Sequence, residues 1–408
     1  MDNELHSTDP DSRPRPVVRL KPKADARRLR FGFPLVYDSD LVTDRRTKAL
    51  KPGTLARLED AGRANLGLAA VTPGSKIIAR ILDRNPEAEI DRAWFEARLS
   101  RALALRQTLY DQPFYRLVHA EADGLPGIVI DRFGAAAVLQ PNAAWAERHL
   151  DALVEALIAV TGVETVVKNA SGRARSLEGL DSEGAVFGKG LTGPVPVAMN
   201  GATYMADLIG GQKTGLFFDQ RDNHAFAADL AHGAKMLDVF SHVGGFGLAG
   251  LAAGATLVTA IDSSKDALAL AEAGAARMGV SERFETFKSD AFDAMTKLAE
   301  ENATYDLVVC DPPAFAPQKA ALEAGLRAYE KTARLGARLT APGGYLVLCS
   351  CSHAADLEKF RNASLRGVGR AGRVAQVIRT GFASPDHPQH AQLTESGYLK
   401  ALFLRLDG

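Results

Sequence analysis

The side chains in this sequence with the clearest capacity for chemistry are carboxylates at the ends of hydrophobic, strand-like runs. Asp238 lies near the start of LDVFSHVGGFG at residues 237–247, and Asp262 ends LVTAID at residues 257–262. Carboxylates at the ends of adjacent parallel strands meet at one edge of a sheet, where doubly wound proteins bind their ligands. One carboxylate can face a charged amino group, and the other can accept hydrogen bonds from ribose hydroxyls. The pair predicts a site for a ligand that contains a nucleoside.

The loop after the first run contains residues that suit such a ligand. Gly244, Gly245 and Gly247 carry no Cβ, so the backbone can approach a ligand closely, and Ser241 offers a hydroxyl. The ending GKS or GKT, which would hold a nucleotide phosphate in a P-loop, is absent. A cofactor without a pyrophosphate, such as S-adenosylmethionine, therefore fits this loop better than a nucleotide does.

Two further carboxylates extend the predicted site. Asp290 in FKSDAFD follows a third strand-like run, and it is either a partner for an adenine amino group or an ordinary helix N-cap. Asp311 begins DPPAF after the run YDLVVC. The two prolines stiffen this turn because they cannot donate backbone hydrogen bonds, and Phe315 is placed to stack on a base. A rigid exit from a strand would explain the prolines, but not the aspartate and phenylalanine together.

The elements that would position these residues change in pattern along the chain. Residues 17–84 alternate short β-like runs with Gly and Pro turns, which predicts a small barrel. Residues 91–194 predict a central α+β domain, with helices over 91–110 and 145–160 and hairpin turns at 123–124 and 133–134. After a strand pair over 195–207, repeated strand–helix units predict a doubly wound, mostly parallel sheet. We expect a disordered leader at 1–15 and domains at 16–90, 91–194 and 195–408.

Composition and charge narrow the classes of function. The 408 residues are 46% hydrophobic and 24% charged, as in globular proteins, and no apolar run approaches the roughly 20 residues that span a bilayer. Three cysteines argue against a disulfide framework and for a cytoplasmic protein, and without CxxC or HExxH spacing we expect no metal. The net charge is zero, but 13 Lys and Arg face 4 Asp and Glu between residues 13 and 57. That excess indicates either a nucleic-acid-binding module or a solvated basic surface.

Longer stretches carry a family resemblance. They are HAEADGLPGIVIDRFG at 119–134, GQKTGLFFDQRDN at 211–223, LDVFSHVGGFG, DPPAF, CSCS at 349–352, DHP and GYLKALF. In content and order they resemble the bacterial 23S rRNA (cytosine-5)-methyltransferases that carry an N-terminal PUA domain. The PUA portion matches more loosely, mainly through the segment RRLRFGFPLVY. The resemblance implies a class I methyltransferase domain with a seven-stranded, Rossmann-like sheet. It also implies S-adenosylmethionine as the cofactor and a PUA barrel that binds RNA.

The patterns and the resemblance together assign residues to roles. The expected cofactor-binding residues are Asp219, Gln220, Arg221, Asp238, Ser241, Gly244, Gly245, Asp262, Asp290 and Asp311. Pro312 and Phe315 are expected to contact the substrate base, and Arg27, Arg28 and Arg30 to bind RNA. In GLFFDQRDN, Phe217 and Phe218 can cover the apolar part of the ligand, while the same segment is also an Asx-rich N-cap for a helix over residues 223–231.

The cysteines bear on which atom is methylated. C5 of a pyrimidine is a poor nucleophile, and a thiolate that adds to C6 makes C5 enamine-like. Cys310 and Cys349 lie within strand-like runs and are expected in the core, whereas Cys351 follows YLVLC where a strand should open into a loop. The resemblance places the catalytic cysteine at Cys351, with Asp311 as a second catalytic residue.

Two positions depart from the family pattern. His353 follows SCS where the family usually has glycine, and it is either a proton shuttle or a loop residue. Ala314 stands where some other cytosine-5 methyltransferases carry a second cysteine, so the resemblance implies that product release uses one cysteine.

The function that these observations favour is methyl transfer to C5 of a cytidine in 23S rRNA or in a large-subunit assembly intermediate. One alternative is methylation of a guanine nitrogen, which does not need Cys351. Another is a ribosome-assembly factor that binds RNA without catalysis. The sequence predicts a cytoplasmic protein without a membrane partner. It leaves open whether the protein forms a homodimer, which cytidine is modified and which group removes the C5 proton.

Overall fold

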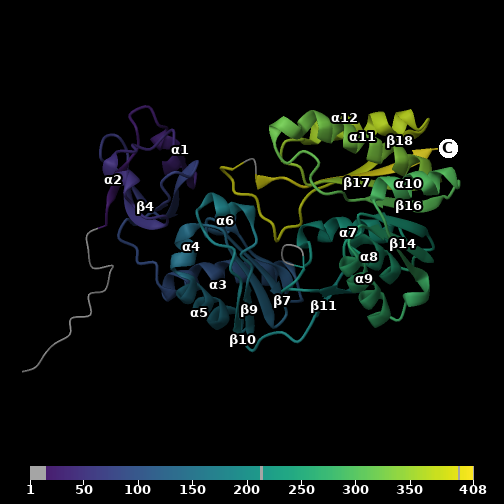
Figure 1. Cartoon of the computed structure of the whole chain (residues 1–408), viewed down its shortest axis with the longest axis horizontal. Helices are drawn as coiled ribbons and strands as arrows, with labels where there is room; N and C mark the ends of the chain where they lie inside the picture. The colour runs from purple at the N-terminus through teal and green to yellow at the C-terminus, as the bar shows by residue number, and fades with distance from the viewer. Residues whose placement is uncertain (1–14, 212–214, 394–395, 408) are drawn as a thin grey trace, which may run out of the picture.

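The computed structural model describes residues 15–211, 215–393 and 396–407, and three units with their own sheets follow one another along the chain (Figure 1). The N-terminal unit lies at the left of Figure 1, the central unit in the middle and the C-terminal unit at the right. Most of the predicted leader, and residues 212–214 of the GQKTG segment, lie outside the described residues.

The N-terminal unit is a curled five-stranded sheet. Its strands have the order β1-β3-β4-β5-β2, and an isolated bridge between Leu20 and Leu41 joins the segments that follow the two edge strands. The five β-like runs predicted from the sequence are therefore strands, and the sheet curls as a small barrel does. The elements are β1 (Val17–Arg19), α1 (Ala26–Arg30), β2 (Leu35–Tyr37), α2 (Arg45–Lys48), β3 (Thr54–Glu59), β4 (Asn65–Val71) and β5 (Ile77–Asp83).

The central unit packs helices on a second five-stranded sheet, β10-β9-β8-β7-β6. Helix α3 begins after Asp91, whose side chain accepts from the backbone N–H of Trp94, and it ends at Leu109, as predicted. The single helix predicted over 145–160 is instead two helices that meet at His149, whose Nδ1 lies 2.7 Å from the Trp145 carbonyl oxygen. The elements are α3 (Arg92–Leu109), β6 (Phe114–His119), η1 (Ala120–Asp123), β7 (Ile128–Phe133), β8 (Ala136–Pro141), α4 (Ala144–Arg148), α5 (Leu150–Thr161), β9 (Thr165–Lys168), α6 (Arg173–Leu177) and β10 (Ala185–Gly188).

The C-terminal unit is the doubly wound sheet that the sequence predicts, and it has seven strands in the order β15-β14-β13-β16-β17-β19-β18. Strands β13 to β17 are parallel to their neighbours, whereas β19 runs antiparallel between β17 and β18. The hairpin of β11 (Val195–Met199) and β12 (Ala202–Ala206) precedes this sheet. The strands are β13 (Lys235–Val239), β14 (Leu257–Asp262), β15 (Phe284–Lys288), β16 (Tyr305–Cys310), β17 (Thr340–Ser350), β18 (Val374–Gly381) and β19 (Lys400–Asp407).

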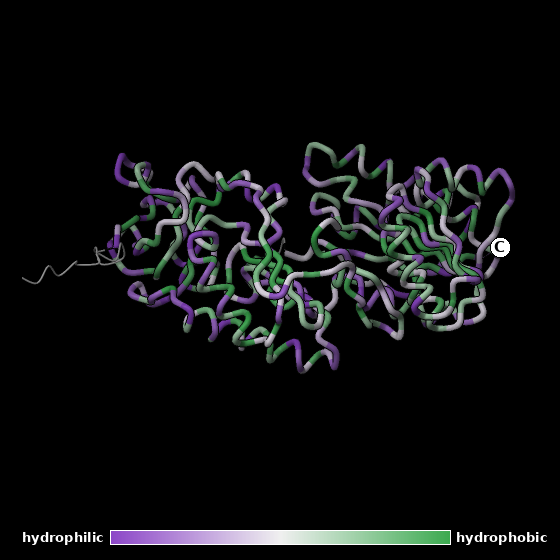
Figure 2. Tube along the Cα trace, turned by 60° about the horizontal axis from the view of Figure 1, so that its bottom comes forward, coloured by the Kyte–Doolittle hydropathy of each residue, from purple (hydrophilic) through white to green (hydrophobic). Residues whose placement is uncertain are grey.

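Both faces of the seven-stranded sheet are covered, so its central strands are apolar along their length (Figure 2). Helices α7, α8 and α9 contribute to the core on one face, and α10, α11 and α12 to the core on the other. The helices and short 3-10 turns of this unit are η2 (Phe218–Gln220), α7 (Arg221–Asp229), α8 (Gly245–Ala252), α9 (Lys265–Arg277), η3 (Ser281–Arg283), α10 (Ala291–Glu300), η4 (Lys319–Ala321), α11 (Leu322–Leu339) and α12 (Leu357–Arg370). In the described part of the chain, none of the helices combines the length and apolar character that crossing a membrane requires.

The start of α7 differs from the prediction. The helix begins at Arg221 rather than Asn223, because the 3-10 turn η2 leads directly into it, and the residue before it makes no side-chain capping bond. The backbone N–H of Asp222 instead donates to the hydroxyl of Ser384, 2.9 Å away. A partner 162 residues away in sequence thus takes the place of the local Asx cap.

Candidate active site

The register of the parallel strands brings three of the predicted carboxylates to one edge of the sheet. Val239 of β13 is paired with Ile261 of β14 on one side and with Cys310 of β16 on the other. Asp262 and Asp311 each come one residue after these partners, so they flank the loop that leaves β13. Asp238 lies one residue before Val239.

Asp238 is fully buried, and only one of its two carboxylate oxygens has a hydrogen-bond partner among the described residues. Its Oδ2 accepts from the backbone N–H of Gly247 at 2.8 Å, while its Oδ1 has no hydrogen-bond partner among the described residues. Burial raises the pKa of Asp238 to about 7; the bond from Gly247 lowers it, and the nearby charge of Asp262 adds to the rise. A buried carboxylate oxygen without a donor is poised to accept a hydrogen bond from a ligand.

The loop after β13 has an unusual backbone. Phe240 and His242 have φ angles of 62° and 49°, and Gly244 has φ 79°. Left-handed backbone at side-chain-bearing residues costs on the order of 1–3 kcal/mol each and is concentrated at functional sites. The backbone N–H of His242 donates to Asp262 at 2.9 Å, which fixes this conformation beside the end of β14.

The glycines of this loop serve packing more than the sequence suggests. A Cβ at Gly245 would lie 2.8 Å from the ring of His224, and one at Gly247 would lie 2.8 Å from Val258. Gly245, Gly247 and Gly250 also have the GxGxxG spacing, but all three lie inside α8, and a Cβ at Gly250 would lie 2.7 Å from the sulfur of Met236. The expectation that these glycines leave space for a ligand is therefore incomplete, because neighbouring side chains fill that space.

A cavity opens at this edge of the sheet, and Asp238 is one of its lining residues. Three other lining residues also carry a buried polar atom that has no hydrogen-bond partner among the described residues. The atoms are Gln220 Nε2, His224 Nδ1 and Ser241 Oγ. Donors and acceptors that converge in this way suit a polar, nucleoside-sized ligand. The lining residues are Leu216, Phe217, Gln220, His224, Asp238, Phe240, Ser241, His242, Val243, Gly245, Phe246 and Asp311.

The predicted trio at residues 219–221 points in three directions. Gln220 lines the cavity. Asp219 accepts a hydrogen bond from the hydroxyl of Tyr398, and the guanidinium of Arg221 lies 4.0 Å from the Tyr110 ring and donates to the carbonyl oxygen of Phe114. Arg221 therefore contacts the central unit.

The apolar residues before this trio also differ in placement. Phe217 lines the cavity, with its ring 5.0 Å from that of His242. Phe218 is 1% exposed and packs on Phe133 of the central unit, at a ring distance of 5.1 Å. Only the first of the two phenylalanines is thus placed to cover a ligand.

Two other predicted cofactor partners make local bonds. The carboxylate of Asp262 accepts from the backbone N–H groups of His242 and Ser264, one at each oxygen. Asp290 is exposed and is the N-cap of α10, accepting from Phe292 and Asp293. Since a carboxylate has about four lone-pair sites, Asp262 retains acceptor capacity.

The three cysteines differ in access. Cys310 and Cys349 are 0% and 1% exposed and belong to the cores on the two faces of the sheet, as predicted. Burial raises the pKa of both thiols well above the ordinary range. Cys351 is partly exposed and follows the last residue of β17. Of the three, it is the one that a substrate can approach.

Alternation along the chain explains the exposure of Cys351. Ser350 and Ser352 are fully buried and share the hydroxyl of Tyr329, at 2.9 Å and 2.6 Å. The ammonium of Lys400 donates to the carbonyl oxygens of Ser352 and Ala355, both at 2.7 Å. Side chains on either side of Cys351 are thus anchored in the interior, and its own side chain is directed to the other side.

The DPPAF segment has a buried proline and an aromatic environment. Pro312 is buried and Asp311 lines the cavity. The ring of Phe315 lies 5.0 Å from Tyr329, 6.1 Å from Phe292 and 6.3 Å from Phe240. Phe315 is half-buried, so protein rings already occupy part of the surface that was expected to stack on a base.

The predicted RNA-binding arginines lie on α1 of the N-terminal unit. Arg27 and Arg28 lie over the rings of Phe31 and Phe33, at 5.2 Å and 3.4 Å from the ring centres. Arg30 forms an ion pair with Asp60. Phe31 is 63% exposed, so one arginine and one aromatic ring stand together at the surface.

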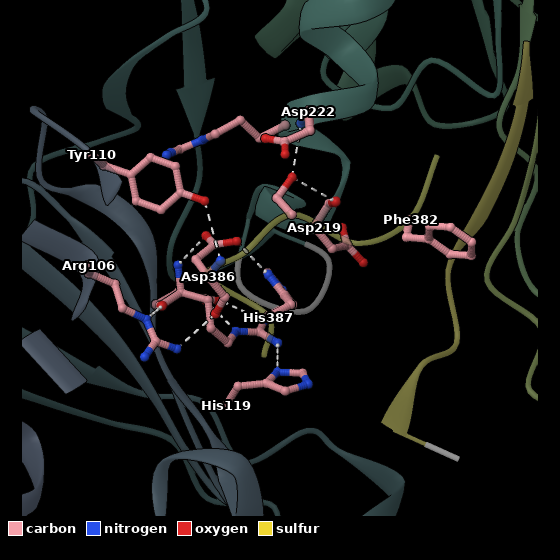
Figure 3. Close-up of polar contacts among 12 residues, drawn as sticks. Arg106, Tyr110, His119, Asp219, Asp222, Phe382, Asp386 and His387 are labelled. Atoms are coloured by element: carbon pink, nitrogen blue, oxygen red, sulfur yellow. Dashed lines mark hydrogen bonds and ion pairs between the residues drawn. The ribbon is translucent and has the colours of Figure 1, made fainter. Parts of the chain in front are cut away.

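The structure adds a buried polar network that the sequence did not predict (Figure 3). Asp386 lies in the connection between β18 and β19. Its Oδ2 accepts a hydrogen bond from the backbone N–H of Arg116 at 2.9 Å, and its Oδ1 lies 2.8 Å from Nδ1 of His387. Its carbonyl oxygen accepts from Arg106, which also pairs with Asp123. The DHP motif contains Asp386 and His387, and Asp123 was predicted only as part of a turn. No pattern in the sequence marked Arg106 or Arg116.

The chain matches known families in two places. Residues 184–394 match a family described as S-adenosylmethionine-dependent methyltransferase, and residues 18–84 match a PUA-like domain. The chain is 35% identical over 414 residues to the ribosomal RNA large subunit methyltransferase of Deinococcus radiodurans, covering 98% of this chain and 100% of that protein. It is 34% identical over 390 residues to the ribosomal RNA large subunit methyltransferase I of Alteromonas mediterranea, covering 94% and 97%.

Two solved structures share the fold of the whole chain. An S-adenosylmethionine-dependent methyltransferase from Streptococcus mutans has a TM-score of 0.79 at 19% identity, covering 96% of this chain and all of that one. A methyltransferase complexed with SAH has a TM-score of 0.79 at 20% identity, covering 96% and 99%. At these identities the likeness concerns the fold alone.

Asp238→Asn is expected to remove a pH-dependent loss of stability. An unfolded aspartate has a pKa near 3.9, so the folded protein binds more protons than the unfolded chain between about pH 4 and 7. Wild-type stability therefore falls relative to Asp238→Asn as the pH rises through this window, by up to about 4 kcal/mol. Chemical denaturation followed by circular dichroism between pH 4 and 8 measures this, with Asp229→Asn on the surface as control. Parallel pH profiles of wild type and Asp238→Asn would contradict it.

Asp386→Ala is expected to lower the free energy of unfolding by roughly 1–3 kcal/mol, since the buried N–H of Arg116 loses its acceptor. Asp386→Asn retains an acceptor oxygen and should lose less. Urea denaturation of both variants tests this, and equal stabilities of Asp386→Ala and wild type would show that the network does not hold the connection.

Proposed function

This chain belongs to the S-adenosylmethionine-dependent methyltransferases of large-subunit ribosomal RNA, and we propose that it transfers a methyl group to C5 of a cytidine in 23S rRNA. The expected cofactor is confirmed by the family. The proposal concerns the atom and the mechanism. The observation that carries it is the access of Cys351, at the edge of the sheet where the cavity opens.

The donor set of the cavity fits S-adenosylmethionine. Asp238 Oδ1 and Ser241 Oγ, without partners in the described part of the chain, would take the amino-acid end, and Asp262 would accept from the ribose hydroxyls. Gln220 and Phe217, which line the cavity, would cover the ligand, and Asp290, at the start of α10 and outside the cavity lining, would meet the adenine amino group. When bound, this cofactor supplies an electrophilic methyl group, and the protein's own residues must create a nucleophile to receive it.

Cys351 would create that nucleophile. Its thiolate adds to C6 of the cytosine, the C5–C6 double bond shifts electron density to C5, and C5 takes the methyl group. Loss of the C5 proton then restores the double bond and releases the thiolate. Cys310 and Cys349 cannot serve, because they are buried neutral thiols.

Asp311 and its neighbours would hold the base. Asp311 lines the cavity one residue after β16, and the carbonyl of Pro312 lies in the same rigid turn. A half-buried Phe315 supports one side of this pocket. The target cytosine must leave its stack to reach this depth.

The N-terminal unit would bind flanking RNA in 23S rRNA or in an assembly intermediate. Arg27 with the exposed Phe31 offers charge and a stacking surface together. A substrate of this kind places the enzyme in the cytoplasm. Phosphate contacts of this unit would supply affinity, whereas the pocket at Asp311 would select the base.

Cys351→Ala is expected to reduce methylation of rRNA below detection while S-adenosylmethionine binding, measured by calorimetry, is retained. Cys349→Ala is the matched control: it removes a buried thiol two residues away and should cost about 1 kcal/mol of stability with activity retained. Wild type should also form a covalent adduct with RNA that carries 5-fluorocytidine, since no C5 proton can leave.

Robust methylation by Cys351→Ala, together with no adduct on the fluorinated RNA, would reject the C5 mechanism. Methylation of a guanine nitrogen would then account for the activity, because that chemistry needs no thiol. Absence of methylation by wild type on any rRNA fragment or particle would favour a factor that binds RNA without catalysis.

A further inference from the structure

A tyrosine on the strand beside Cys351 leaves the sheet at the same end. Strands β17 and β19 are antiparallel, and Ser350 is paired with Lys400 in the last step of the ladder. Cys351 comes one residue after Ser350, and Tyr398 comes two residues before Lys400. The ring of Tyr398 lies 5.5 Å from that of His353, two residues beyond the cysteine. Tyr398 therefore stands next to the loop that presents the thiol.

The hydroxyl of Tyr398 donates a hydrogen bond to Oδ2 of Asp219. Asp219 is only 8% exposed, and its Oδ1 has no hydrogen-bond partner among the residues that the structure describes. Its main chain is held by Ser384, whose N–H and hydroxyl both donate to the Asp219 carbonyl oxygen, at 2.9 Å and 3.1 Å. The carboxylate is thus fixed in position and retains capacity to accept a proton.

Two other polar groups near Cys351 are engaged in hydrogen bonds of their own. The hydroxyl of Tyr329 is shared by Ser350 and Ser352, and the ammonium of Lys400 donates to two carbonyl oxygens. An ammonium has no lone pair with which to accept a proton. His353, exposed at the surface of the loop, and Asp311, which lines the cavity, are rival acceptors.

We propose that Tyr398 and Asp219 remove the C5 proton from the methylated cytidine adduct, an inference that rests on the proposed function. Tyr398 accepts the proton at its hydroxyl oxygen while its own hydroxyl proton passes to Asp219. The electron pair of the broken C5–H bond forms the C5–C6 double bond, and the bond between C6 and the Cys351 sulfur breaks to release the thiolate. Asp219 is left protonated and returns its proton to solvent after the RNA departs.

The protonation of the tyrosine agrees with this role. Burial, with the Asp219 carboxylate next, holds the pKa of Tyr398 well above its usual range, so the phenol is protonated at neutral pH. A phenol that both donates to a carboxylate and faces a substrate can pass a proton without becoming a free phenolate. This also separates its role from that of Cys351, which must be a thiolate to react.

Tyr398→Phe should stop the reaction after methyl transfer. With ordinary rRNA and S-adenosylmethionine labelled in its methyl group, the variant should accumulate a denaturation-resistant protein–RNA adduct that carries the label. Release of methylated RNA should fall at least about 100-fold, the usual scale for loss of a general base. Asp219→Asn should accumulate the same adduct. The double variant Tyr398→Phe with Cys351→Ala should form none.

Two variants serve as controls. Tyr345→Phe removes a hydroxyl at the opposite end of the same strand pair, where Tyr345 is paired with Arg405, and should behave as wild type. His353→Gln should also release product normally. Accumulation of the adduct by His353→Gln instead of Tyr398→Phe would transfer the role to the histidine.

Other outcomes separate this proposal from the one it rests on. Product release by Tyr398→Phe at the wild-type rate would overturn the assignment. So would failure of Tyr398→Phe to form the adduct with 5-fluorocytidine RNA, because the tyrosine would then act before proton removal. Failure of wild type itself to form that fluorinated adduct would instead reject the C5 mechanism.

Discussion

The site depends on the register of parallel strands at one edge of the seven-stranded sheet. Because Val239 pairs with both Ile261 and Cys310, the residues that follow on three strands come together without help from loops. The next strand, β17, pairs with β16 and ends at Ser350, so Cys351 reaches the same edge. The carboxylates at the strand ends and Cys351 are thus placed by backbone hydrogen bonds. The strained loop after β13 then shapes the cavity between them.

The connection between β18 and β19 ties the three units to this edge. Ser384 holds the main chain of Asp219, Asp386 is bound by Arg106 and Arg116 of the central unit, and Leu393 is buried in the core of the N-terminal unit. The same connection leads to Tyr398 and then to β19. The PUA-like unit is therefore linked mechanically to the residues around Cys351.

Much of the fold could be predicted from the sequence because its signals are local. Apolar runs predicted β13, β14, β16 and β17, and the turn at Gly134 and the helix over 91–110 were also predicted from residue types. The break at His149 was not, because a single helical period continues through it. The start of α7 was misplaced since its first turn is completed by Ser384, a residue that no local pattern connects to it.

In the site, too, local patterns were predictable, whereas contacts with residues far away in the chain were not. The carboxylates at strand ends and the access of Cys351 follow from alternation and register, which a sequence displays. Arg221 was grouped with the cavity by its neighbours, yet its guanidinium contacts Tyr110 and Phe114 of the central unit. The pairing of Tyr398 with Asp219 joins positions 179 residues apart, and no spacing rule predicts it. Contacts between residues far apart in the chain were therefore the part that only the structure could supply.

We propose that this edge of the sheet methylates a carbon atom through a thiol. The most direct test is the chemical identity of the product. Ribosomal RNA from cells that lack this enzyme would be treated with the protein and labelled S-adenosylmethionine, digested to nucleosides and analysed by mass spectrometry. We predict that the label is recovered in 5-methylcytidine. Recovery of the label in an N-methylguanosine would contradict it.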